Sequence, residues 1–119
     1  FGGNPLACAV AREALKLLRN EKLSERANTL GAKITAELSK QDLPMVQEVR
    51  GKGALIGIEL KKASGGARKY CERLADVGIL CKETHDYVIR IAPPLVIEES
   101  DLIAGIKKVV QVIQKTHSP

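Results

Sequence analysis

Aromatic side chains are scarce in this chain: tryptophan is absent, and Phe1, Tyr70 and Tyr87 make up 3% of the sequence. Few side chains are therefore able to stack on nucleobases, so nucleic-acid binding is not expected, although the 119 residues carry a net charge of +5. The 19 lysines and arginines are spread along the chain rather than gathered in one run. A solvated surface explains them best, and a stand-alone basic α+β module that binds an anionic partner stays as an alternative.

Long apolar runs and clustered metal ligands are also missing. No apolar stretch is long enough to cross a bilayer and no basic-then-apolar leader is present, so we expect a cytoplasmic protein without a membrane partner. Cys8, Cys71 and Cys81 lack the close spacing of a zinc or redox motif, and no metal site is expected. Free thiols in a reducing compartment are the simpler interpretation. The chain begins at Phe1 and its single methionine is Met45, so we expect it to be part of a longer protein.

Helical periodicity predicts four helices in the chain. Asn4 is a good N-cap and Pro5 suits the first helical position, which predicts a helix from Pro5 onward. A second helix is predicted over residues 21–39, where Gly31 should weaken it by roughly 1 kcal/mol relative to alanine. Two more amphipathic helices are predicted, over residues 67–77 with Gly78 as a left-handed cap and over residues 98–115.

Alternating patterns between these helices predict a small sheet. The four strands are expected at residues 45–50, 54–60, 79–82 and 87–92, with turns at 51–53 and 83–86 and a stop at Pro93-Pro94. The fold class is therefore α+β: a small, mostly antiparallel sheet with helices packed on one face, preceded by two N-terminal helices. We divide the chain into a helical segment, 1–43, and an α+β domain, 44–119.

Arg90 is the most informative single residue because it stands between Ile89 and Ile91 in an apolar strand. A guanidinium keeps its charge, so this side chain must either reach solvent or meet an anion. One interpretation is that the Val88/Arg90/Ala92 face is exposed, or that Arg90 forms an ordinary salt bridge. The other is a guanidinium fork that binds a carboxylate in bidentate fashion.

Other candidate residues carry weaker signals. The Gly2-Gly3-Asn4 segment would bring backbone N–H groups near an anion, but a simple N-cap accounts for it better. His85 and His117 are predicted to be an ordinary loop histidine and a disordered terminal one. No nucleophile stands beside a base and an orienting partner, so no catalytic residue is expected in this chain.

Several segments together resemble one known family over almost the whole chain. Residues 1–8 are similar to the segment that follows the cofactor-binding domain in class III aminotransferases (the ornithine, acetylornithine and 4-aminobutyrate group). Residues 49–53 and 55–60 are similar to the hairpin of that family's C-terminal domain. Residues 78–85 and 89–97 most resemble the branch that acts on ornithine.

The resemblance implies a pyridoxal-phosphate enzyme, active as a homodimer on amino-acid and 2-oxo-acid substrates. It implies that the Schiff-base lysine lies upstream of Phe1, in a large domain to which residues 1–43 form the link, so this portion should be inactive alone. Arg90 matches the family arginine that binds the α-carboxylate of glutamate or 2-oxoglutarate. Gly2 and Gly3 match backbone near the cofactor phosphate of the neighbouring subunit.

The resemblance also implies a reaction. The parent protein is expected to transfer the δ-amino group of ornithine to 2-oxoglutarate, which gives glutamate semialdehyde and glutamate. The segment 82–85 favours ornithine. Acetylornithine and 4-aminobutyrate are the alternative amino donors within the family.

Overall fold

The computed structural model describes residues 1–116; residues 117–119, and with them His117 and the end of the predicted 44–119 domain, lie outside the described part. The elements follow one another as α1 (Pro5–Asn20), α2 (Leu23–Ser39), β1 (Val46–Lys52), β2 (Leu55–Leu60), a short 3-10 turn (Lys62–Ser64), α3 (Arg68–Asp76), β3 (Lys82–Thr84), β4 (Val88–Ile91) and α4 (Glu99–Thr116).

The four strands form one antiparallel sheet in the order β1-β2-β4-β3, which confirms the predicted α+β class. The predicted hairpin between β1 and β2 is tighter than expected. Lys52 pairs with Leu55, so Gly51 and Lys52 belong to the strand rather than to the turn. Only Gly53 has the positive φ that the tight turn needs, at +56°.

The third strand was predicted at residues 79–82 and is found at Lys82–Thr84. The predicted start was wrong because Ile79 still belongs to the helix end: its N–H donates to the Leu74 carbonyl at 2.8 Å, beside Gly78 at φ +84°. Pairing with β4 begins only at Lys82. The connection then turns through His85 and Asp86, whose φ angles of +49° and +60° lie in the left-handed region that tight turns use. His85 is thus a turn residue, as predicted.

Three helices cover one face of the sheet. Helix α4 packs against both α2 and α3, and together with the inward side chains of β2 and β4 they enclose one apolar core. Residues Ile56, Ile58 and Leu60 of β2 point into this core, as their alternation predicts. No helix within residues 1–116 lies over the opposite face of the sheet. Leu55 of β2 and Arg90 of β4 are exposed there, whereas Val88 of β4 is buried.

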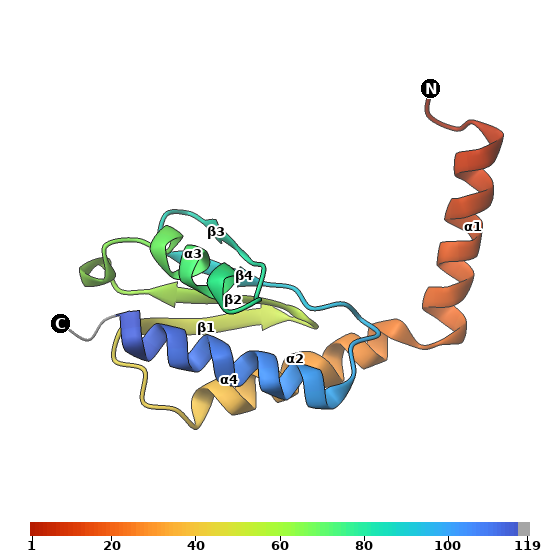
Figure 1. The fold of residues 1–119 in the computed structure, drawn as a ribbon. Coiled ribbons are helices and arrows are strands. Elements are labelled where there is room, and N and C mark those ends of the chain that lie inside the picture. The colour runs from red at the N-terminus through yellow and green to blue at the C-terminus, as the bar shows by residue number, and fades with distance from the viewer. Residues whose placement is uncertain (117–119) are drawn as a thin grey trace.

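Helix α1 stands apart from this body (Figure 1). Its cap is as predicted, since the Asn4 side chain accepts a hydrogen bond of 2.9 Å from the Ala7 N–H. None of its residues is buried, and its apolar side chains, including Leu6, Val10 and Leu17, are exposed. The chain passes from α1 into α2 through Lys22, whose φ of +50° lies in the left-handed region. Among residues 1–116, no helix is both long enough and apolar enough to cross a membrane.

Gly31 does more than weaken α2. It is buried where the helix meets the β1–β2 turn, and a Cβ built on it would lie 1.9 Å from the Gly53 carbonyl oxygen. The contact is with backbone, which has no side-chain rotation to relieve it. Gly31 is therefore the residue that lets the hairpin approach α2 closely.

Replacing Gly31 with alanine should accordingly destabilise the domain by about 1–3 kcal/mol, because the overpacking outweighs the gain in helix propensity. The matched control is Gly105→Ala in α4, where the new Cβ would find its nearest neighbour, the Ile79 Cδ1, at an ordinary 3.7 Å. That variant should be neutral or more stable. Urea unfolding of both variants measures the difference, and equal stabilisation in the two would contradict the close approach.

Candidate functional site

Strand β4 places Arg90 on the open face of the sheet. Ile89 and Ile91 are buried in the helix-covered core, so the alternation of a strand directs the side chain between them to the opposite side. Arg90 and Ala92 are exposed, whereas Val88 is buried, so the face is not uniformly open. Pro93 and Pro94 follow directly and end the strand.

The neighbours of Arg90 leave its guanidinium unpaired. Across β2 it faces Gly57, which has no side chain, and across β3 it faces Lys82. No hydrogen bond or ion pair links the Arg90 side chain to any residue in the described range 1–116. Arg90 therefore forms no salt bridge within residues 1–116, in contrast to one of the two interpretations of the sequence.

Arg50, by contrast, already pairs with two carboxylates through its Nη1. It lies on the same face, across Gly57 from Arg90, and pairs with Glu48 at 2.9 Å and with Glu59. The hydrogen bond to Glu59 raises the pKa of Arg50. Of these two arginines on one face, only Arg90 has no carboxylate partner within residues 1–116, so its whole guanidinium is available to an anion from outside them.

A third arginine, Arg26 of α2, holds the segment that follows β4. Its Nε donates to the Leu95 carbonyl and its terminal nitrogen to the Ile97 carbonyl, each at 2.6 Å. Lys33 of the same helix pairs with Glu99 at the start of α4. The strand that carries Arg90 is thus anchored just beyond its end by α2. Sequence reasoning missed Arg26, since its partners are 69 and 71 residues away and are backbone atoms.

Gly2 and Gly3 do not lie with Arg90 in a common site within this chain. They precede α1, which leads away from the body (Figure 1). A Cβ at either glycine would meet no atom within 4 Å, so both are surrounded by open space. Gly3 has a φ of +76°, and the neighbouring Asn4 amide donates to the Phe1 carbonyl at 3.0 Å.

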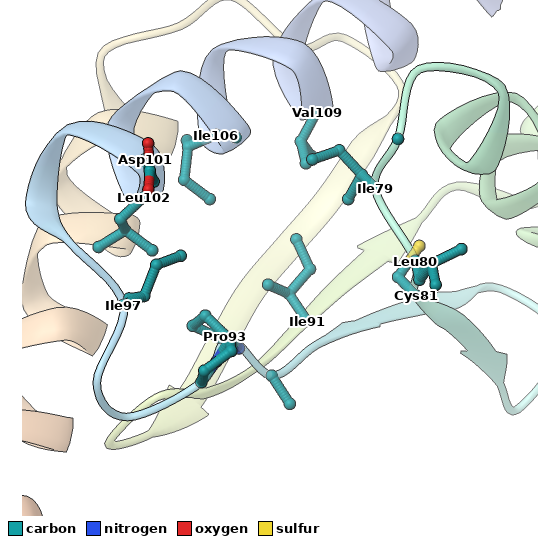
Figure 2. A pocket seen from close by; sticks show the side chains of 14 residues that line it. Ile79, Leu80, Cys81, Ile91, Pro93, Ile97, Asp101, Leu102, Ile106 and Val109 are labelled. Carbon is teal, nitrogen blue, oxygen red and sulfur yellow. The ribbon is translucent and has the colours of Figure 1, made fainter.

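An apolar hollow of about 200 Å³ opens between α4 and the segments on either side of the β3–β4 hairpin (Figure 2). The aliphatic residues Ile79, Ile91, Leu102, Ile106 and Val109 line it together with one carboxylate, Asp101. Arg90 is not among its lining residues. Among the described residues, no group of three His, Cys, Asp or Glu side chains is placed to bind a metal ion.

Comparisons with known proteins agree with one another. The profile of the family "Aminotransferase class-III" matches residues 1–113. An ornithine aminotransferase from Macrococcus caseolyticus is 56% identical over 115 residues, which are 97% of this chain and 28% of that protein. The chain thus spans little more than a quarter of the length of the curated relatives it matches.

Solved structures show the same relationship. The ornithine aminotransferase from Toxoplasma gondii superposes with a TM-score of 0.90 at 37% identity, over 98% of this chain and 28% of that one. An acetylornithine aminotransferase from Elizabethkingia anophelis superposes with a TM-score of 0.84 at 43% identity, over 97% and 31% of the two chains.

The two hydrogen bonds that Arg26 donates to the Leu95 and Ile97 carbonyls, called the Arg26 fork below, can be tested by substitution. Arg26→Ala should lower the free energy of unfolding by about 1–2 kcal/mol, because two charge-assisted bonds to backbone carbonyls are lost at an exposed position. Hydrogen exchange of the amides in 95–99 should rise at the same time. Arg12→Ala, in the solvent-exposed helix α1, is the matched control and should change neither quantity. Unchanged exchange in the Arg26 variant would show that the fork does not hold this segment.

Proposed function

The chain belongs to the class III aminotransferase family, and on that premise we propose that it is the C-terminal part of an ornithine aminotransferase in which Arg90 binds substrate. The parent reaction would transfer the δ-amino group of ornithine to 2-oxoglutarate, giving glutamate semialdehyde and glutamate. The names of the relatives support this choice, since curated ornithine aminotransferases from Macrococcus caseolyticus, Bacillus cereus and Bacillus subtilis match over 95–97% of the chain. We further propose a cytoplasmic homodimer, as the family resemblance implies.

The observation that carries the proposal is the unpaired guanidinium of Arg90. An α-carboxylate matches the guanidinium fork in bidentate geometry, and the cross-strand neighbour Gly57 has no side chain that could pair with the guanidinium in its place. A charge-assisted contact of this kind is worth roughly 1.5–3 kcal/mol. The segment anchored by Arg26 would fix the strand while the remainder of the polypeptide approaches the open face.

Pyridoxal phosphate, the cofactor that the family uses, would supply an electron sink for the amino transfer. The residues described here do not form a site for it on their own. No lysine within 1–116 is buried, and Gly2 and Gly3 stand in open space. We therefore place the Schiff-base lysine outside this chain and assign to Gly2 and Gly3 only the shaping of backbone near the cofactor phosphate of the partner subunit.

The division of the chain at residue 43 remains a prediction. Helix α2 lies before this boundary yet contributes Leu30, Ile34 and Leu38 to the core of the second part. Helix α1 has apolar side chains that no described residue buries. We therefore expect α1, rather than α2, to make the main contact with the large domain.

Acetylornithine is the alternative amino donor, favoured by the 43% identity with the acetylornithine aminotransferase structure. Arg90 would bind the same α-carboxylate of glutamate in either enzyme, so this residue does not separate the two donors. Steady-state rates of the full polypeptide with ornithine and with acetylornithine do separate them. A preference for acetylornithine would replace the amino donor and keep the role of Arg90.

Arg90→Lys in the full polypeptide should lower kcat/KM for the glutamate half-reaction by roughly tenfold or more, because the bidentate contact is lost while the charge stays. The ornithine half-reaction should change less. Single-turnover measurements with each amino acid alone read the two half-reactions separately.

Arg50→Lys is the matched control, since Arg50 lies on the same face but is occupied by Glu48 and Glu59. It should leave the ratio of the two half-reactions unchanged. Equal losses in both half-reactions of the Arg90 variant would refute its role as the glutamate carboxylate site.

A further inference from the structure

Two of the three cysteines meet in space. Cys71 lies on α3 and Cys81 on the segment that leads into β3, and the two thiols are close enough for each to shift the pKa of the other. Both line one surface hollow, together with Arg68, Glu72, Lys82 and Glu83. The linear spacing of Cys71 and Cys81 gave no hint of this pair, because the chain between them completes a helix and reverses direction through Gly78.

The two thiols differ in access. Cys71 is 6% exposed, whereas Cys81 is only partly buried and also lines the apolar hollow on its other side (Figure 2). A small reagent in solution therefore reaches Cys81 first. Cys71 needs no access of its own, since its reaction partner would be the neighbouring sulfur. This is the arrangement of an attacking thiol and a resolving thiol.

We propose that Cys71 and Cys81 form an oxidisable dithiol, which a low-molecular-weight disulfide such as oxidised glutathione converts into an intramolecular disulfide that joins α3 to the segment before β3. The crosslink ends one residue before Lys82, the cross-strand partner of Arg90.

The chemistry balances in two exchange steps. The Cys81 thiolate attacks one sulfur of the small disulfide, forms a mixed disulfide and releases one small thiol. The Cys71 thiolate then attacks the Cys81 sulfur, which forms the protein disulfide and releases the second small thiol. The two protons lost by the protein thiols pass through solvent to the two released thiols. The protein is oxidised by two electrons and the small disulfide is reduced.

The surroundings make this exchange depend on pH. Burial raises the pKa of Cys71 to about 12, and burial also raises the pKa of Cys81, although the neighbouring Cys71 thiol acts to lower it. The charged groups around the pair are Arg68 and Glu72 on α3, Lys82 and Glu83 on β3, and Asp101 across the apolar hollow. Both thiols are protonated at neutral pH, so below these pKa values the thiolate fraction of each rises about tenfold per pH unit.

The test uses the full polypeptide under native conditions, incubated with oxidised glutathione at pH 7, 8 and 9, then alkylated and digested with trypsin. Cys71 and Cys81 fall in separate tryptic peptides, 70–73 and 74–82, so the disulfide appears as one linked pair by mass spectrometry. We expect that linked pair, with an initial rate that increases about a hundredfold from pH 7 to pH 9, as the rise in the thiolate fraction requires. Cys8, which has no cysteine partner among the described residues, should carry at most a mixed disulfide.

Single variants assign the two roles. In Cys71→Ser, Cys81 should accumulate as the mixed disulfide with glutathione, and in Cys81→Ser, Cys71 should stay alkylatable. A wild-type protein in which Cys81 holds glutathione while Cys71 is alkylated would overturn the proposal. So would a linked pair that forms only in urea, or none at any pH. Aminotransferase activity is not read in this experiment, so its outcome is independent of the proposed function.

Discussion

The constraint on which this structure depends is a sheet that, within residues 1–116, is covered by helices on one face only. Burying Ile89 and Ile91 under α4 and its neighbours forces Arg90 to the uncovered face, because a strand has a period of two. The same rule places Gly57 and Lys82 beside it. A fully buried arginine would require an internal partner, whereas the open face lets its charge remain available. The core and the candidate site are thus two consequences of one alternation.

Most of the fold was predictable from the sequence because its signals are local. The caps at Asn4 and Gly78 and the 3.6-residue periodicity fixed the helices to within about two residues, which is the usual scatter of helix ends. The strand found at Lys82–Thr84 was predicted too early in the chain, because a hydrogen bond from the Ile79 N–H back into α3 keeps residue 79 out of the sheet. Boundaries of this kind depend on tertiary pairing, which a single sequence does not display.

The candidate site likewise has one feature that the sequence reveals and others that only the folded chain reveals. Arg90 stood out because a charge between two isoleucines is a local anomaly. The Arg26 fork and the Cys71–Cys81 contact join segments that only the folded chain brings together, and Gly31 carried a misleading signal. The cost of Gly31 in helix propensity is visible in the sequence. The Gly53 carbonyl that makes a glycine necessary there belongs to the β1–β2 turn, which the sequence does not place beside α2.

Helix α1 extends from the body as a rigid rod that is joined to it at Lys22. Its 16 residues extend roughly 24 Å from the left-handed residue Lys22. A rotation of about 10° at that residue would displace the far end by roughly 4 Å, with little change in the packing of the body, since α1 buries nothing. Small changes in the φ and ψ angles of Lys22 therefore determine the position of Gly2 and Gly3 relative to the body.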